Sequence, residues 1–414
     1  LLREHGVVAV YTAEDIPGEN NCGPIVHDDP FLAPDEVNFI GQAVAVVVAR
    51  EMVYAREAAK RAKLHIEPLP AILTIEDALA ADSFVMPPKS IHRGDAAAAL
   101  AAAPHRLSGS TRTGQQEQFY LEGHITYAVP REDGQLTLYS STQHPEGNQK
   151  EAAAALNLQT KDVEVICRRM GGAFGGKEGN ASIFSQSAAL AAHLLKKPVK
   201  LRVGRDDDML ITGKRHDFRI DYDVGFDDSG RILGLDVMLA SRCGYSMDYS
   251  GPVNDRALLH IDNCYYLPNL SIIGHRCKTH TQSSTAFRGF GGPQGMFGIE
   301  TVIDEIARKL GLDPLDVRQA NLYRASDDPA TLTTQYGQQI EDWIGDQVLA
   351  EVEARANYRA RRAEIAQWNA LHRTRKRGIA ITPLKFGISF TATLLNQAGA
   401  LVNIFNDGSV AVNH

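Results

Sequence analysis

The sequence predicts an α+β protein of several domains, and three features support this prediction. At 414 residues the chain is long enough for two to four domains, each with its own core. Residues 1–80 alternate strand-like and helix-like patterns, whereas strand-like patterns dominate residues 105–325. The composition, 44% hydrophobic and 22% charged, is typical of a soluble globular protein.

Residues 1–80 are predicted to form a compact α/β unit. EVNFIGQAVAVVVA (36–49) predicts a strand, EMVYAREAAKRAKL (51–64) an amphipathic helix, and KLHIEPLPAILT (63–74) a second extended segment. This order predicts a βαβ-like crossover. The longest apolar run, Ala43–Ala49, is about a third of the length that crosses a bilayer, so we expect a buried strand and no membrane contact.

Residues 81–104 are predicted to be a linker with an Ala-rich helix, which begins with Asp95 as N-cap and ends at Pro104. In the strand-rich region 105–325, alternation around Asp-Asp-Ser-Gly predicts a hairpin over residues 219–239. IETVIDEIARKLG predicts a helix that ends at Gly311, and Asp313-Pro314 begins another.

Residues 326–414 are predicted to hold an irregular segment, a long charged helix from Val348 to about His372, and a β-rich region. The basic cluster HRTRKR fits a solvated helix end. The chain starts without Met, and its last strand pattern has no terminating turn. We therefore expect the natural protein to extend beyond both ends.

Charge and cysteine content exclude several classes of partner. A formal net charge of −7 gives no footprint for nucleic acid. The five cysteines are widely spaced and form no C-x-x-C pair, so neither zinc nor an iron–sulfur cluster is expected on this chain. Without a signal peptide, a reducing cytoplasmic location is expected.

The stretch Gly171–Lys177 has the G-x-x-x-x-G-K spacing of a phosphate-binding loop. The next residue is Glu178, where that loop needs Ser or Thr to hold magnesium, and its negative charge would repel triphosphate. The strand-like VEVIC before the loop and a helix capped by Asn180 after it still suit such a site. Nucleotide hydrolysis is nevertheless the weaker interpretation, and a glycine-rich turn that positions Glu178 at a ligand is the alternative.

A second glycine-rich stretch, TAFRGFGGPQG (285–295), interleaves aromatic rings and Arg288 with glycines. Such a loop suits a flat polar ligand or a pterin-like cofactor that carries phosphate. Two loops of this kind in one chain favour a shared binding site over two unrelated turns.

The pair of loops resembles the molybdenum hydroxylases, the xanthine dehydrogenase and aldehyde oxidase family. Five stretches carry the resemblance in family order: STQHP (141–145), GGAFGGKE (171–178), DRALLHIDNCYYLPN (255–269), TAFRGFGGPQG (285–295) and KFGISFTATLLNQAGA (385–400). The resemblance implies an α/β hammerhead domain over residues 1–80, incomplete at its start. A first molybdenum-cofactor-binding domain over 105–325 would follow, and then a linker helix and the incomplete start of a second such domain over 326–414.

The resemblance also implies roles for individual residues at a molybdopterin cofactor. Gln143 would lie near the apical side of the metal, Phe174 and Gly175 at its oxo face, and Arg288 would contact the pterin. The molybdenum would be held through molybdopterin, with no direct protein ligand.

At the substrate, Glu178 and Arg256 would face the heterocycle from opposite sides as catalytic residues. Phe290 and Phe390 would sandwich its ring, and Thr391 would hydrogen-bond it. A purine gains negative charge on its ring atoms during hydroxylation, so a fixed Arg256 stabilises the transition state more than the ground state. Since an aldehyde gives neither charged residue a partner, the pair favours xanthine or hypoxanthine.

Three positions leave structural alternatives open. Arg256 could form an ion pair with Asp255 or Asp262, and Phe390 could be a core residue. Gln118 stands where the family often has His, so a hydrogen bond beneath the site could differ.

The implied reaction is hydroxylation of hypoxanthine and xanthine toward urate with water as the oxygen source. Electrons would pass through [2Fe–2S] clusters and FAD, on a partner subunit or another part of the chain, to NAD. A dimer of heterodimers is expected. No Glu in these residues matches the family's base motif, so the chain alone should be inactive. The alternatives are an aldehyde oxidase-like or other molybdenum hydroxylase, or a non-catalytic binding protein if the natural chain ends at His414.

Overall fold

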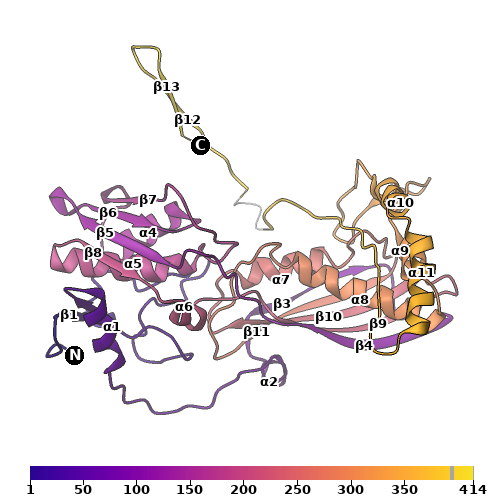
Figure 1. Ribbon diagram of the computed structural model, residues 1–414, viewed down its shortest axis with the longest axis horizontal. Coiled ribbons are helices and arrows are strands. Elements are labelled where there is room, and N and C mark those ends of the chain that lie inside the picture. The colour runs from indigo at the N-terminus through magenta and orange to yellow at the C-terminus, as the bar shows by residue number, and fades with distance from the viewer. Residues whose placement is uncertain (392–395, 414) are drawn as a thin grey trace.

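The computed structural model describes residues 1–391 and 396–413. Residues 392–395 and His414 lie outside the described residues. Residues 392–395 are part of the stretch 385–400 that resembles the molybdenum hydroxylases. The molecule is elongated, with a smaller lobe at one end and a larger sheet toward the other (Figure 1).

The smaller lobe is built on a four-stranded sheet of order β7-β6-β5-β8. Helices α4 and α5 pack against this sheet and each other, and the antiparallel strand pair β1–β2 adds Tyr11 and Val46 to the same core. Its elements are β1 (Val7–Tyr11), β2 (Val46–Ala49), α1 (Met52–Lys60), β5 (Ile125–Pro130), β6 (Leu136–Ser140), α4 (Pro145–Ala155), β7 (Val163–Ile166), α5 (Asn180–Leu195) and β8 (Val199–Arg202).

The larger sheet has the order β3-β11-β10-β9-β4, in which only β10 and β11 run parallel. Helix α8 packs on the sheet face that carries Ile220, and α3 packs on the face that carries Gly225. Its elements are α2 (Ile75–Ala80), β3 (Phe84–Arg93), α3 (Ala96–Ala102), β4 (His105–Thr113), β9 (Phe218–Phe226), β10 (Ile232–Gly244), α7 (Ser250–Leu259), β11 (Leu270–Lys278) and α8 (Gly292–Leu310).

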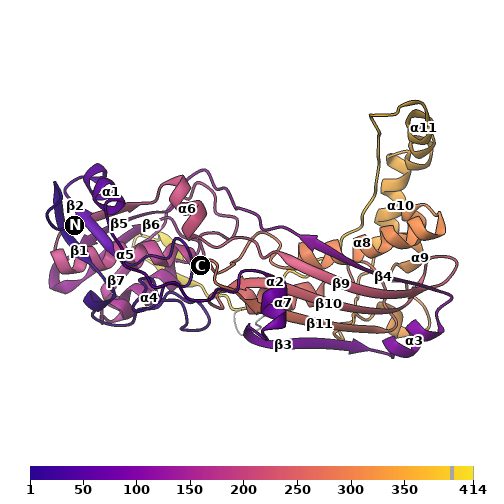
Figure 2. The ribbon, with the colours of Figure 1, turned by 90° about the horizontal axis from the view of Figure 1, so that it is seen from below.

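The remaining elements lie between the lobes, at the far end of the large sheet, or on connections. Helices α9 to α11 gather beyond α8 (Figures 1 and 2), and the hairpin β12–β13 projects from the body (Figure 1). They are η1 (Ala13–Asp15), η2 (Glu132–Gly134), η3 (Thr160–Asp162), α6 (Arg205–Ile211), α9 (Pro314–Asn321), η4 (Pro329–Leu332), α10 (Gly345–Arg355), α11 (Tyr358–Leu371), β12 (Leu401–Ile404) and β13 (Val410–Asn413).

The chain order explains why loops collect between the lobes. The chain builds β3 and β4 of the large sheet, leaves to form the four-stranded sheet, and returns to complete the large sheet with β9 to β11. The outgoing residues 114–124 and the returning residues 203–217 meet, where Arg215 N donates to Gln116 O at 3.0 Å. Loops that are distant in sequence therefore share one region.

Several predicted elements are confirmed. Strands β9 and β10 form the hairpin expected over residues 219–239. Gly311 ends α8 at φ 70°, a left-handed conformation that favours glycine. The side chain of Asp313 accepts a hydrogen bond from Leu315 N at the start of α9. No helix among the described residues is both long and apolar enough to cross a membrane.

The βαβ crossover predicted for residues 1–80 is wrong. Strand β1 pairs with β2 in antiparallel fashion, and the residues after α1, expected to extend as a second strand, pair with no strand. Pro68 and Pro70 fall in that segment and lack the backbone N–H that a ladder requires.

The linker predicted for residues 81–104 contains structured elements instead. Strand β3 pairs with β11 at the edge of the large sheet, and α3 packs on the sheet. The predicted helix start is confirmed, because Asp95 Oδ1 accepts a hydrogen bond from Ala98 N at 2.9 Å.

The long helix predicted from Val348 to His372 is divided into α10 and α11. Asn357 separates them with φ 47° and ψ 46°, a left-handed conformation that asparagine tolerates better than most residues. In the β-rich region predicted after Gly378, the described residues form one hairpin, β12–β13.

Asp95→Ala should lower the free energy of unfolding by about 1 kcal/mol, because it removes the side-chain cap of α3. Asp95→Asn is the matched control, since its amide oxygen can still accept the hydrogen bond. Urea unfolding followed by circular dichroism would measure both variants. Equal stability of the two variants would show that the cap contributes nothing.

Candidate active site

The two glycine-rich loops meet in the structure, more than a hundred residues apart in sequence. Arg288 N donates to Phe174 O at 2.9 Å. Gly175 has φ 98°, and a Cβ there would lie 2.7 Å from both C and O of Ala286. Glycine is therefore required at position 175 for both backbone conformation and close approach.

Gln143 joins this junction from the end of β6. Its side-chain Oε1 accepts hydrogen bonds from Gly175 N at 2.9 Å and Lys177 N at 3.3 Å. Its backbone N donates to Lys177 O at 2.8 Å. The exposed side chains of Gln143, Phe174 and Arg288 thus lie around the junction of the two loops.

The Lys177 side chain is buried away from these exposed side chains, which rules out the phosphate-loop interpretation. The residue is fully buried, and its Nζ donates to Glu122 O at 2.7 Å and Ser141 Oγ at 2.8 Å. The ammonium also lies 4.7 Å from the centre of the Tyr120 ring. The expected capping role of Asn180 is wrong as well, because α5 begins at Asn180 and Gly179 occupies the N-cap position.

Glu178 borders a cleft of about 780 Å³ that Gln143, Glu151, Tyr249 and Phe390 also line. Burial raises the pKa of Glu178 to about 7. Burial likewise raises the pKa of Glu151 to about 7. Near neutral pH these carboxyl groups can therefore hold or release a proton at the cleft wall.

Phe290 and Phe390 pack against each other in this structure. Their ring centroids are 5.3 Å apart with a 49° angle between the planes. A planar ring stacked between them would need roughly 7 Å, twice an aromatic contact distance. The sandwich expected for substrate therefore requires the two rings to separate.

Arg256 binds main-chain carbonyls at the segment that leads into Phe390. Nη1 donates to Gly387 O at 2.6 Å, and Nη2 donates to Ser389 O. The ion pairs considered from the sequence are not formed, because Asp255 binds Lys89 and Arg276 while Asp262 binds Lys385. Arg256 does not line the cleft beside Glu178.

Two further expected residues have structural contacts. Thr391 Oγ1 donates to Pro252 O at 3.3 Å, which ties the segment after Phe390 to α7. Gln118 Nε2 donates to Ala286 O at 3.0 Å, directly beneath the loop junction. Gln118 therefore supplies a hydrogen bond at the position where the expected family pattern has His.

Arg215 is a site residue that the sequence analysis missed. It is 8% exposed, its Nε donates to Gln116 Oε1 at 2.7 Å, and its Nη2 donates to Arg288 O at 2.9 Å. Its guanidinium stacks 3.8 Å from the centre of the Phe287 ring. Nη1 has no partner among the described residues, and burial lowers the pKa of Arg215 to about 10.

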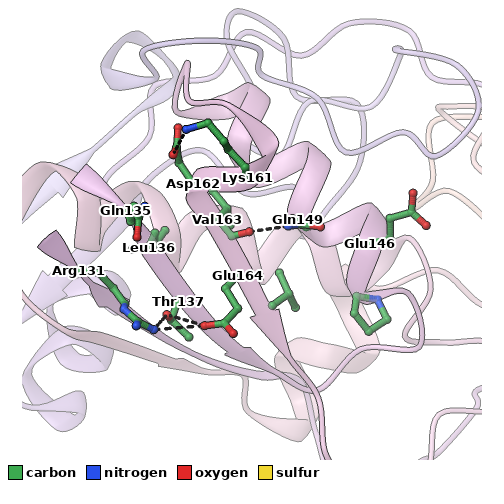
Figure 3. A pocket seen from close by; sticks show the side chains of 12 residues that line it. Arg131, Gln135, Leu136, Thr137, Glu146, Gln149, Lys161, Asp162, Val163 and Glu164 are labelled. Carbon is green, nitrogen blue, oxygen red and sulfur yellow. Dashed lines mark hydrogen bonds and ion pairs between the residues drawn. The ribbon is translucent and has the colours of Figure 1, made fainter. Parts of the chain in front are cut away.

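A second hollow, of about 500 Å³, lies away from the loop junction along β6 and β7 (Figure 3). Arg131 contacts Thr137 and Glu164, and Lys161 pairs with Asp162. None of the predicted site residues lines this hollow, and these charged side chains have partners within it. It is therefore a weaker candidate than the Glu178 cleft.

Family models match three successive parts of the chain. Residues 80–322 match the molybdopterin cofactor-binding domain, and residues 351–414 match a second molybdopterin cofactor-binding domain. Residues 2–70 match the α/β hammerhead domain of aldehyde oxidase and xanthine dehydrogenase. The chain belongs to the xanthine dehydrogenase and aldehyde oxidase family. The predicted fold class and the prediction of molybdopterin as cofactor are confirmed.

Individual relatives in this family differ in their named reactions. The chain is 43% identical to xanthine dehydrogenase from Drosophila subobscura, over 100% of this chain and 31% of that protein. It is 42% identical to nicotinate hydroxylase hnxS from Emericella nidulans, over 99% of this chain and 31% of that protein. The chain thus spans about a third of the length of these curated relatives.

A solved relative shares the fold. Aldehyde oxidoreductase from Desulfovibrio gigas superposes with a TM-score of 0.81 at 27% identity, over 88% of this chain and 41% of that chain. Because the superposition covers 88% of this chain, it includes residues of both lobes.

The residues at the loop junction fit an anionic pterin cofactor of this family. Gln143 and Phe174 present exposed side chains at the junction, and Arg288 places an exposed guanidinium beside them. Nη1 of Arg215 is buried without a partner among the described residues, a costly arrangement for a cation that a bound anion would relieve. Among the described residues no three metal-ligating side chains gather, so a metal would have to be held by the cofactor.

Gly175→Ala should separate the loops and reduce cofactor retention, because its Cβ would overlap the backbone of Ala286. Gly134→Ala is the matched control. Gly134 also has a positive φ, 80°, but a Cβ there would meet no atom within 4 Å, so this variant tests backbone strain alone. Molybdenum content per protein, measured by mass spectrometry, should fall severalfold only for Gly175→Ala. Equal molybdenum content in both variants would contradict the required close approach.

The pKa of Glu178 is about 7 in the folded state and about 4.5 in the unfolded state, so the folded state binds this proton more tightly. The contribution of Glu178 to stability should therefore be lost as pH rises from about 4.5 through about 7. Glu178→Gln removes this titration, so the variant should gain stability relative to the unaltered protein between pH 5 and pH 8. Thermal unfolding at both pH values would measure the gain. Glu164→Gln, at an exposed position on β7, is the control, and a gain of equal size there would contradict the assignment.

Proposed function

We propose that the chain supplies part of the active site of a molybdenum-dependent hydroxylase that converts hypoxanthine and xanthine toward urate with water as the oxygen source. The observation that carries this proposal is the cleft beside the loop junction, which presents the Glu178 carboxyl group. Similarity to xanthine dehydrogenases along the whole chain supports it.

In this proposal Gln143, Phe174, Gly175 and Arg288 hold the cofactor. Molybdopterin, when bound, supplies the metal that delivers oxygen derived from water and accepts two electrons. The protein surface orients it: Gln143 is fixed by Gly175 N and Lys177 N, and the Phe174 backbone is fixed by Arg288 N.

Glu178 is proposed to hold a proton shared with a ring nitrogen of the substrate. A carboxyl group that titrates near pH 7 can accept from a ring N–H when ionised and donate to a bare ring nitrogen when protonated. Phe290 and Phe390 would part to stack on the two faces of the ring, and Thr391 would hydrogen-bond it.

Arg256 is proposed to stabilise negative charge that develops on the purine. In the structure it lies behind the aromatic pair, with its guanidinium 5.9 Å from the centre of the Phe290 ring. The Nε atom is buried without a partner among the described residues. Entry of substrate between the rings would bring the positive charge of Arg256 close to the heterocycle.

Further parts of the proposal concern the whole enzyme. Electrons would leave through [2Fe–2S] clusters and FAD to NAD, on a partner subunit or another part of the chain, in a cytoplasmic dimer of heterodimers. Residues 1–414 alone would not turn over substrate, since none of their glutamates matches the family's base motif.

Hydroxylation of nicotinate or of an aldehyde is the second candidate function, since relatives bear those names. The carboxyl groups of Glu151 and Glu178 line the same cleft, and neither forms an ion pair within the described part of the chain. When ionised, they would repel a carboxylate substrate such as nicotinate. This charge pattern favours an uncharged purine.

Arg256→Met in the assembled enzyme should reduce kcat/KM for hypoxanthine by about 10² to 10³-fold, the usual effect of removing one group that stabilises developing charge. Turnover of an aromatic aldehyde should fall much less, because its ring has no nitrogens and no oxo groups to gather this charge. Steady-state kinetics with both substrates would measure the difference.

Arg106→Met, which removes an exposed arginine paired with Asp223 on the large sheet, is the control. Equal losses for purine and aldehyde in Arg256→Met would mean that Arg256 acts only by holding residues 387–389. That result would remove the argument for a purine substrate.

A further inference from the structure

Tyr249 is a cleft residue to which the sequence motifs assign no role. It occupies the N-cap position of α7 and lines the same cleft as Glu178 and Phe390. Its ring meets Phe290 edge-on, with centroids 6.0 Å apart and planes at 63°. The residue is 6% exposed, so its ring is fixed by packing.

The hydroxyl of Tyr249 differs from those of comparable buried tyrosines. Tyr120, Tyr265 and Tyr323 donate their hydroxyls to Asp208, Glu300 and Asp262. Within the described ranges 1–391 and 396–413, no hydrogen bond reaches the Tyr249 hydroxyl. The hydroxyl oxygen is not one of the fully buried side-chain atoms without a partner. It therefore opens into the cleft that Tyr249 lines, where it can donate to a ligand.

The charges around Tyr249 keep its hydroxyl a donor. Burial raises the pKa of Tyr249 far above its usual value, and the neighbouring Glu178, Asp248 and Glu151 raise it further. The hydroxyl therefore stays protonated at any physiological pH. Glu178, beside it in the cleft, can accept a hydrogen bond when ionised.

We propose that Tyr249 and Glu178 together recognise the lactam edge of an oxo-substituted heterocycle, with the Tyr249 hydroxyl donating to its exocyclic C=O and Glu178 accepting from the adjacent ring N–H. This inference rests on the proposed function and names the chemical feature that the cleft selects. A lactam presents one donor beside one acceptor, which matches this pair of side chains. An unsubstituted ring or an aldehyde lacks that paired edge.

The discrimination follows from the cost of an unmade hydrogen bond. A site built to hydrogen-bond a polar substrate group disfavours analogues that lack it, because its own buried polar groups then stay unpaired. Tyr249 therefore sets specificity between oxo-substituted and unsubstituted rings. It takes no part in the bond-making step.

Tyr249→Phe in the assembled holoenzyme tests the inference, because it removes one oxygen atom and keeps the ring against Phe290. The variant should lower kcat/KM for hypoxanthine about tenfold more than that for unsubstituted purine, the effect of one neutral hydrogen bond. Equilibrium binding of hypoxanthine, measured by calorimetry, should weaken by a similar factor. Tyr222→Phe is the control, since Tyr222 lies on β9 in the large sheet and carries the same chemical change.

Each outcome decides between the two proposals. A Tyr249→Phe variant that loses nothing, or that loses hypoxanthine and purine turnover equally, overturns the lactam assignment. Failure of the unaltered holoenzyme to bind hypoxanthine overturns it too. Binding that weakens in Tyr249→Phe, without purine turnover by the unaltered enzyme, supports the lactam site and overturns the proposed reaction.

Discussion

The close backbone contact between the two glycine-rich loops is the constraint on which the site depends. Gly175 lies against the backbone of Ala286 and Phe287, and Arg288 N binds Phe174 O. A side chain at position 175 would force these segments apart. The contact fixes the surface around Gln143, and that same loop then carries Glu178 into the cleft wall.

Hydrogen bonds from two buried cationic side chains connect the segments around this contact. Lys177, one residue before Glu178, is held inside the smaller lobe by Glu122 O and Ser141 Oγ. Neighbouring residues of one loop therefore have opposite roles, one anchoring the loop and the other facing the cleft. Arg215 performs a related task on the returning chain, where it binds Gln116 and the carbonyl of Arg288 while Nη1 stays unpaired among the described residues.

Sequence reasoning predicted the local elements well and the connections poorly. Alternation around Asp-Asp-Ser-Gly predicted the β9–β10 hairpin, because both strands are local and their turn is encoded between them. It failed for β3, whose pairing with β11 joins residues far apart in the chain. It also failed at Asn357, where a left-handed conformation divides one periodic pattern into two helices.

The sequence by itself determined the family, the two glycine-rich loops and the candidate residues Gln143, Glu178 and Arg288, because short motifs record the chemistry of their side chains. Only the tertiary structure decided which groups share a surface. It placed Tyr249 and Glu151 in the cleft with Glu178, and it turned Arg256 toward the carbonyls of Gly387 and Ser389. The reason is that burial, pKa and hydrogen-bond partners depend on contacts between distant segments, which no local pattern contains.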